Sequence, residues 1–420
     1  MDLLVYGIGQ LATSLGAEPR RGAAQGDLSL LRDAYVLVRD GRIAEVGEGR
    51  RPRFNGPSLD AEGRCVTPGL VDPHTHTVFA GSRVPEFLAR AHGEKYTGGG
   101  ILATVRATRE ASEEDLVGLA RPRLLRMLQM GVTAVEVKSG YGLTTGDEVK
   151  MLRAVRRLGD QLSLTLVPTF MGAHAFPPEV PREAYVRLLV EEMIPAVARQ
   201  GLAQFCDVFC DRGFYTVDEA RAILGAARDA GLGLKVHADE LAWVGAAELA
   251  GELGAVSAEH LLHISPEGIA ALAAAGTVAV LLPATAFVLD EPFPPARDLL
   301  AAGVPVALGT DFNPGSSPVA SLPLAMSLAV LRMEMSPAEV LVAATLNAAA
   351  AIGLADRLGS LEPGKQADLV VWDAQSYEEI PYWIGQNLAR AVVAGGRIVA
   401  PPHPNPLPRR GEGKGETRGC

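Results

Sequence analysis

Hydrophobic and polar positions repeat in a regular way through the middle of the chain. Eight short apolar runs predict buried strands, at residues 69–76, 132–138, 164–170, 205–209, 233–237, 255–260, 277–282 and 304–310. Longer stretches with helical patterning separate these runs. Eight successive β-then-α units predict an α/β fold, a parallel (β/α)8 barrel of the TIM type. A doubly wound open sheet is the structural alternative.

Helix start signals follow several of the predicted strands. Thr145, Thr216 and Ser336 each stand three residues before a glutamate, which is the spacing of a capping box. Ser265 is followed by Pro266, a pair typical of an N-cap and the first helical position. These signals predict helices between the strands and so support the barrel.

The two ends of the chain have a different pattern. Two β-like runs between residues 35 and 46 flank Asp40-Gly41, a strong hairpin signal. Residues 367–372 and 391–400 are again β-like. We therefore expect a small β-sandwich domain built from residues 1–64 and 355–400, beside a barrel at residues 65–354. Residues 401–420 are rich in proline and glycine, which predicts a disordered tail.

Composition and charge narrow the class of protein. The 420 residues are 48% hydrophobic and 21% charged, with a net charge of −10, which is typical of a globular enzyme. Lysine and arginine form no dense cluster, so we expect no nucleic-acid partner. We find no signal-peptide pattern and no unbroken apolar run of membrane-spanning length, so we expect no membrane partner. Four cysteines without a disulfide pattern fit a cytoplasmic protein.

The segment Asp72-Pro-His74-Thr-His76 ends the first predicted strand. Because side chains alternate along a strand, His74 and His76 point the same way. Two imidazoles so placed can bind one metal ion. A single histidine in such a position is more often a core or surface residue. The pair therefore favours a metal site at the end of the first strand.

Other strands also end in residues that can act as ligands or catalysts. The fifth predicted strand ends at His237, with Glu240 in the loop behind it. The sixth ends at His260, and the eighth is followed by Asp311. His174 follows the third. Barrel active sites lie at the C-terminal strand ends, so we expect these side chains to meet there.

This arrangement of histidines and one aspartate resembles the metal-dependent amidohydrolase superfamily, over nearly the whole chain except the tail. The resemblance implies the barrel and the terminal β domain. It also implies metal ligation by His74, His76, His237 and Asp311. Such a ligand set suits zinc or iron. Many relatives bridge two metals with a modified lysine on the fourth strand, but residues 205–211 contain no lysine, which favours one divalent or trivalent ion.

The same resemblance implies hydrolysis of a ring amide by three catalytic residues. Asp311 would take a proton from the attacking water, and His260 would hold the water or the developing oxyanion. Glu240 would deliver a proton to the ring nitrogen that leaves. Which of the three accepts the first proton stays open. Lys138, at the end of the second strand, is interpreted as a structural or pocket charge, not as a metal bridge.

Four local motifs narrow the resemblance, at residues 71–83, 136–143, 169–179 and 311–316. Together they resemble the branch of the superfamily that opens an imidazolone ring in histidine degradation. They imply hydrolysis of a small molecule, 4-imidazolone-5-propanoate, to N-formimino-L-glutamate. Arg83 would bind the substrate carboxylate. The other implied substrate contacts are Tyr96, Tyr141, His174, Glu240, Asn313, Gly315 and Ser316.

Two other functions stay open. A ring deaminase of the cytosine or guanine type shares the spacing of His237 and Glu240 and the single metal, and ammonia release from those bases would distinguish it. A scaffold without catalytic activity should have lost metal ligands, and none is missing from the sequence. The apolar stretch at residues 319–332 is typical of an outer helix that associates, so we expect a homodimer.

Overall fold

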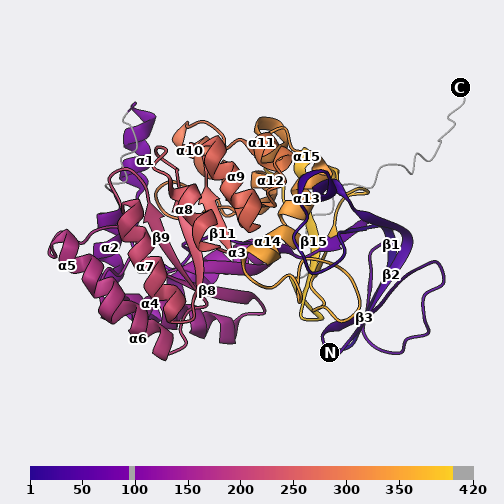
Figure 1. Ribbon diagram of the computed structural model, residues 1–420. Helices are drawn as coiled ribbons and strands as arrows, with labels where there is room; N and C mark the ends of the chain where they lie inside the picture. The colour runs from indigo at the N-terminus through magenta and orange to yellow at the C-terminus, as the bar shows by residue number, and fades with distance from the viewer. Residues whose placement is uncertain (94–99, 401–420) are drawn as a thin grey trace, which may run out of the picture.

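The computed structural model describes residues 1–93 and 100–400. Two sheets organise these residues: a parallel barrel surrounded by helices, and a mixed sheet at one side of it (Figure 1). The expectations for Tyr96 and for a disordered tail at residues 401–420 lie outside the described residues. Among the described helices, none combines the length and the apolar character needed to cross a bilayer.

Eight parallel strands form the barrel, and each falls on one of the predicted apolar runs. They are β6 (Leu70–Asp72), β7 (Val132–Lys138), β8 (Thr165–Ala173), β9 (Phe205–Cys210), β10 (Gly233–Ala238), β11 (Ser257–His260), β12 (Val278–Leu281) and β13 (Val306–Leu308). They are hydrogen-bonded in sequence order. The first and last strands meet beyond their ends, where the Asp311 N–H donates to the His74 carbonyl at 3.0 Å. The predicted barrel is thus confirmed.

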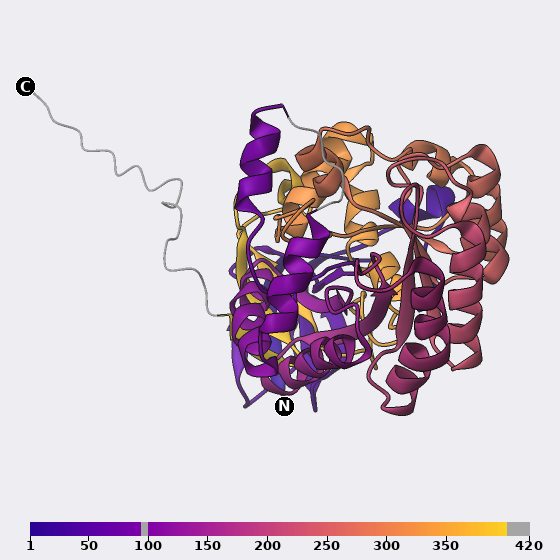
Figure 2. The ribbon, with the colours of Figure 1, turned by 90° about the vertical axis from the view of Figure 1, so that its left-hand side faces the viewer.

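Helices follow the strands and surround the barrel (Figures 1 and 2). They are α1 (Val84–Ala91), α2 (Ile101–Glu110), α3 (Glu113–Gln129), α4 (Thr145–Gln161), α5 (Arg182–Leu188), η2 (Leu189–Met193), α6 (Ile194–Arg199), α7 (Val217–Asp229), α8 (Ala246–Leu253), α9 (Pro266–Ala275), α10 (Pro283–Leu289), α11 (Ala296–Ala301), α12 (Leu322–Arg332), α13 (Pro337–Ala343) and α14 (Leu346–Ala351). Thr216 and Ser336 close capping boxes, and Ser265 caps α9, as predicted. The prediction for Thr145 was wrong by one residue, because the side chain of Thr144 caps α4.

The small β domain is a mixed sheet of eight strands that come from both chain ends. Its strands are β1 (Leu3–Thr13), β2 (Ser29–Arg39), β3 (Arg42–Glu48), β4 (Ser58–Asp60), β5 (Cys65–Pro68), β14 (Leu369–Trp372), β15 (Ala389–Ala394) and β16 (Arg397–Ala400), with η1 (Gly22–Gly26) after β1 and α15 (Glu379–Tyr382) after β14. β5 pairs with β1 in parallel and with β14 antiparallel, so it joins the two ends. Asp40 and Gly41 turn between β2 and β3 with φ of 50° and 76°, as the hairpin signal predicted.

Trp372 anchors the small sheet against the barrel. Its side chain is fully buried, and its Nε1 donates to the Thr67 hydroxyl at 2.8 Å. A Cβ at Gly131, in the turn before β7, would lie 2.9 Å from the Trp372 ring. Gly131 also has a φ of 94°, which glycine adopts without strain. A glycine at this turn therefore lets the small sheet and the barrel meet.

Candidate active site

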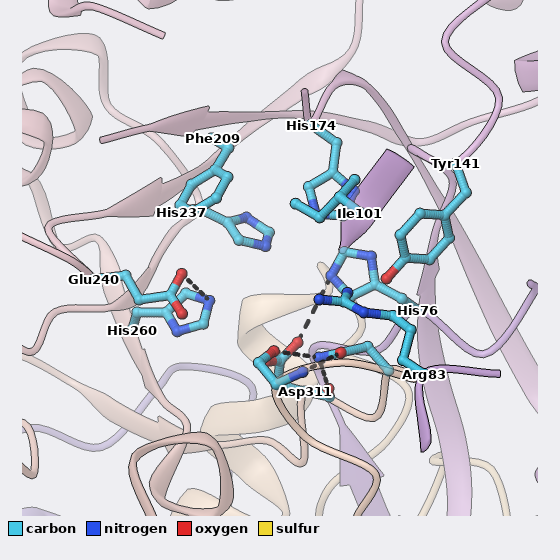
Figure 3. A pocket seen from close by; sticks show the side chains of 12 residues that line it. His76, Arg83, Ile101, Tyr141, His174, Phe209, His237, Glu240, His260 and Asp311 are labelled. Atoms are coloured by element: carbon cyan, nitrogen blue, oxygen red, sulfur yellow. Dashed lines mark hydrogen bonds and ion pairs between the residues drawn. The ribbon is translucent and has the colours of Figure 1, made fainter. Parts of the chain in front are cut away.

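A pocket at the C-terminal ends of the barrel strands gathers side chains from many elements (Figure 3). Ile101, at the start of α2, and Phe209, near the end of β9, line it and were not predicted, because an apolar residue carries no chemical signal. The other lining residues were all expected: His76, Arg83, Tyr141, His174, His237, Glu240, His260, Asp311, Asn313 and Ser316. His74 is fully buried beside the pocket, and Gly315 lines a neighbouring hollow.

His74, His76 and Asp311 meet where the first and last strands of the barrel join. Nε2 of His74 lies 3.4 Å from Oδ1 of Asp311, and Nε2 of His76 lies 3.7 Å from the same oxygen. One donor atom from each residue lies within 4.8 Å of the other two. Ligands that share a tetrahedral zinc ion are roughly 3.3–3.6 Å apart, given metal–ligand bonds of about 2.0–2.2 Å. The His74–Asp311 distance falls in this range and the His76–Asp311 distance lies 0.1 Å above it, so the three side chains are close to the spacing of ligands of one ion.

His237 and His260 approach His74 from the ends of β10 and β11. The ring centroids of His74 and His237 are 4.5 Å apart, and those of His237 and His260 are 5.1 Å apart. These three histidines form a second group of possible metal ligands, which shares His74 with the first group. The structure thus brings the four predicted ligands together, and His260 lies among them.

The histidines of the pocket are in the form that binds metals. Burial disfavours the charged imidazolium and lowers the pKa of His174 and His237 to about 3. It lowers the pKa of His74, His76 and His260 well below the usual value. Among the described residues, Nε2 of His74 and Nδ1 of His76 and His260 are buried and have no hydrogen-bond partner. Such atoms normally find a partner, so the neutral imidazoles fit a metal ion.

Two buried carboxyl groups face the histidines. Burial raises the pKa of Asp311 to about 7. Its Oδ2 accepts a hydrogen bond from the Thr285 hydroxyl at 2.8 Å, which leaves Oδ1 turned toward His74 and His76. Burial, followed by the charges of Asp311 and Asp211, raises the pKa of Glu240 well above its usual value. Both carboxyl groups can therefore hold a proton near neutral pH.

Backbone strain marks the same strand ends. His260 and Asp311 have φ of 71° and 52°, a region that residues with a Cβ seldom adopt. Asp239, next to Glu240, has a φ of 51°. Such conformations cost on the order of 1–3 kcal/mol each and gather at functional sites. These residues lie at the ends of β10, β11 and β13, where His260, Asp311 and the neighbouring Glu240 line the pocket.

Asp211 holds the loop that carries Glu240. Its Oδ2 accepts the backbone N–H groups of Glu240 and Leu241 at 2.7 and 2.8 Å, and Oδ1 accepts that of Ala242 at 3.2 Å. The Oε2 of Glu240 lies 3.6 Å from Nε2 of His260 (Figure 3). Sequence reasoning missed Asp211, because a carboxylate after a strand gives no sign of which loop it will bind.

A second buried carboxylate, Glu148, holds the loop of Tyr141. It accepts the N–H groups of Gly140, Gly142 and Leu143 at 2.9, 2.8 and 2.8 Å. The Gly140 carbonyl in turn lies 3.1 Å from Nδ1 of His174. Glu148 thus supports two predicted substrate contacts at once. From the sequence, Glu148 could be predicted only as a residue of a helix, without its contact to this loop.

The loop after β13 is organised by Asn313. Its Oδ1 accepts the N–H groups of Gly315 and Ser316, each at 2.8 Å. Its Nδ2 donates to the Asp311 carbonyl at 2.7 Å and to the Ser316 hydroxyl at 2.8 Å. The amide of Asn313 therefore shapes the rim of the pocket through its own loop.

Arg83 reaches the pocket from the start of α1. Its Nε and Nη2 donate to the Glu86 carboxylate at 2.5 and 2.8 Å, a partner that sequence reasoning missed. Two glycines make room for the guanidinium, since a Cβ at Gly100 or Gly315 would lie 2.5 Å or 2.0 Å from its nitrogens. Glu86 and these glycines hold a cationic group at the pocket rim, next to His76 (Figure 3).

Comparison with known proteins assigns the chain to a family. The model of the Amidohydrolase family matches residues 65–399. The chain therefore belongs to the amidohydrolase family. Imidazolonepropionases of Symbiobacterium thermophilum and Geobacillus kaustophilus are each 51% identical to it, over 95% and 93% of this chain and 97% and 96% of their own lengths. The activity of the chain is that of an imidazolonepropionase, a hydrolase that acts on carbon–nitrogen bonds of a small molecule.

Solved structures agree at the level of the fold. The triazine hydrolase from Arthrobacter aurescens superposes with a TM-score of 0.74 at 20% identity, covering 96% of this chain and 95% of its own. An adenosine deaminase from Xanthomonas campestris with bound zinc superposes with a TM-score of 0.72 at 21% identity, covering 94% and 92%. These similarities support a barrel with an added β domain.

Proposed function

We propose that the chain hydrolyses the ring carbon–nitrogen bond of 4-imidazolone-5-propanoate to N-formimino-L-glutamate in histidine degradation, with one zinc or iron ion. His74, His76, His237 and Asp311 would hold the ion. The observation that carries the proposal is a pocket lined by His76, His237, Asp311 and the guanidinium of Arg83, with His74 buried directly beside it. The flat ring amide of the substrate would face the metal donors, and its carboxylate tail would face the guanidinium of Arg83.

The bound ion would supply an activated water and polarise the ring carbonyl. Asp311, with Oδ2 occupied by Thr285, offers Oδ1 to accept a proton from the attacking water. His260 stabilises the oxygen that becomes negative during the attack. Glu240 carries a proton to the ring nitrogen as the ring opens, and its burial keeps that proton available near neutral pH.

Residues at the rim of the pocket would orient the substrate. Arg83, whose Nε and Nη2 donate to Glu86, binds the propanoate carboxylate through its guanidinium group. Tyr141, His174 and Ser316 line the space beside the ring, and Gly315 leaves room for the guanidinium. Asn313 contributes through the shape of its loop. Tyr96 is proposed as a further contact on the sequence motif alone.

The test is the loss of imidazolone ultraviolet absorbance with purified protein and fresh substrate. Metal-loaded protein should consume the substrate and yield formiminoglutamate, and protein treated with a chelator should not. A folded, metal-loaded protein that leaves the substrate intact would contradict the proposal. Ammonia release from cytosine or guanine under the same conditions would favour the ring deaminase instead.

We further propose that the protein is a homodimer in the cytoplasm. Leu331, Tyr382 and Ile384 are exposed apolar residues on and beside α12 and α15, which contact each other. Most other residues of α12 are buried within this chain, so packing inside the chain also explains why this helix is apolar. Light scattering should give twice the mass of the chain, and the mass of one chain would contradict the dimer.

A further inference from the structure

A cluster of five ionic side chains is fully buried inside the barrel, behind the metal-binding side of the pocket. Three are acidic, Glu136, Asp207 and Glu259, and two are basic, Lys138 and Lys235. They come from β7, β9, β10 and β11. Buried charges are costly unless they are paired. None of the five takes part in the chemistry described above, so their presence calls for a separate explanation.

Lys138 is the centre of this buried cluster. Its Nζ lies 2.7 Å from Oδ2 of Asp207, 2.8 Å from Oε1 of Glu136 and 3.1 Å from Oε2 of Glu259. Lys235 contacts Glu259 through the other oxygen, Oε1, at 2.9 Å. Burial alone would lower the pKa of Lys138, but the three carboxylates outweigh it and raise the pKa. Lys138 therefore stays charged and joins three strands.

The same carboxylate oxygens also face two predicted metal ligands. Oε2 of Glu259 lies 2.9 Å from Nδ1 of His74, within ion-pair distance, although the angles are not those of a hydrogen bond. Oδ2 of Asp207 lies 3.0 Å from Nδ1 of His237, and Oδ1 of Asp207 accepts the His237 backbone N–H at 3.1 Å. A carboxylate behind a histidine keeps the proton on the nitrogen that faces it and aims the other nitrogen at the metal.

We propose that Lys138 is a positioning residue of the metal site. Its ammonium group holds Asp207 and Glu259 where each carboxylate orients one imidazole ligand, His237 and His74 respectively. Three acidic and two basic side chains give the cluster a formal charge of −1. Without Lys138 that charge becomes −2, and the two carboxylates repel each other and lose their common contact. The inference rests on the proposed metal site.

The test measures metal binding directly, by cobalt(II) titration of metal-free protein against a competing chelator and by the visible spectrum of the bound cobalt. Lys138→Met keeps an unbranched side chain that is one heavy atom shorter, and it removes the charge. It should weaken cobalt binding by about tenfold or more, as losses of supporting contacts behind a ligand do, and should shift the cobalt bands. Lys365→Met is the matched control, because Lys365 is also buried and ion-paired but lies in the small β domain.

The outcomes separate the two proposals. If the unaltered protein binds no cobalt, the proposed metal site itself fails. If it binds one ion while folded Lys138→Met keeps the same affinity and spectrum, Lys138 has only a structural role and the inference is overturned.

Should Lys138→Met fail to fold, Asp207→Asn and Glu259→Gln test the same link. Each variant keeps an oxygen that can face the imidazole but loses the ionic contact with Lys138. Both should weaken cobalt binding by about tenfold. Unchanged cobalt affinity in both folded variants would overturn the inference.

Discussion

The pocket has a floor and a rim that are positioned in different ways. The floor consists of the proposed metal ligands His74, His76, His237 and Asp311, and the rim consists of Arg83 and the loops of Tyr141, Glu240 and Asn313. At the floor, ligand side chains project from strand ends, and buried ion pairs such as Lys138–Asp207 stand behind them. At the rim, side chains sit on loops, and Asp211 and Glu148 hold those loops through backbone N–H groups. The floor is thus positioned by paired charges, and the loops at the rim by hydrogen bonds to the main chain. Substitutions at the floor should therefore change metal binding, whereas those at the rim should change substrate binding and turnover.

Removal of a ligand from the floor should have the largest effect. In His237→Ala, we expect hydrolysis to fall by at least about a thousandfold, which corresponds to roughly 4 kcal/mol of transition-state stabilisation. Metal content should fall with it. His263→Ala is the control, since His263 also follows β11 but does not line the pocket. Full metal content and activity in His237→Ala would show that His237 is not a metal ligand.

Loss of the carboxylate that holds the Glu240 loop should come next. In Asp211→Asn, one acceptor oxygen becomes an NH2 group that faces backbone N–H donors, so the loop should shift. We expect kcat to fall by about 10- to 100-fold with metal content unchanged, because general acid–base groups contribute on the order of 10²–10⁴. Asp229→Asn, on the exposed end of α7, should have no effect. A loss of metal in Asp211→Asn would contradict the expectation that substitutions at the rim leave metal binding unchanged.

Arg83→Ala should act on substrate binding. Loss of a charge-assisted contact costs about 1.5–3 kcal/mol, so KM should rise by about 10- to 100-fold while metal content stays the same. Arg83→Lys should recover only part of this, because a lysine lacks the planar fork. Steady-state kinetics decide the matter, and an unchanged KM in Arg83→Ala would count against the carboxylate contact.

Glu148→Gln should have the smallest effect of the four. The glutamine keeps one acceptor oxygen for the Tyr141 loop but turns an NH2 group toward other N–H donors. We expect KM to rise a few-fold and the free energy of unfolding to fall by about 1–3 kcal/mol, the cost of an unsatisfied buried group. Thermal unfolding and kinetics on one preparation would measure both. A stability loss without any change in KM would make Glu148 a purely structural residue.

Much of the fold and of the pocket could be predicted because the signals are local. Apolar runs and caps such as Ser265 depend on neighbours in the sequence, and the barrel follows from their order. The cap of α4 was assigned one residue late because Thr144 and Thr145 are adjacent and both suit the position. Glu86 could not be recognised, since its contact with Arg83 depends on the direction in which α1 starts.

The amino-acid sequence is enough to show which residues end the strands, and therefore which side chains could meet at one end of a barrel. Side-chain alternation and the fixed polarity of parallel strands make that a matter of position along the chain. The contacts that support these side chains depend instead on the folded barrel. Lys138 and Glu259 are far apart in the sequence and lie on strands that are not neighbours, yet their side chains meet inside the barrel at 3.1 Å. Such contacts depend on barrel closure, and no local pattern of residues encodes them.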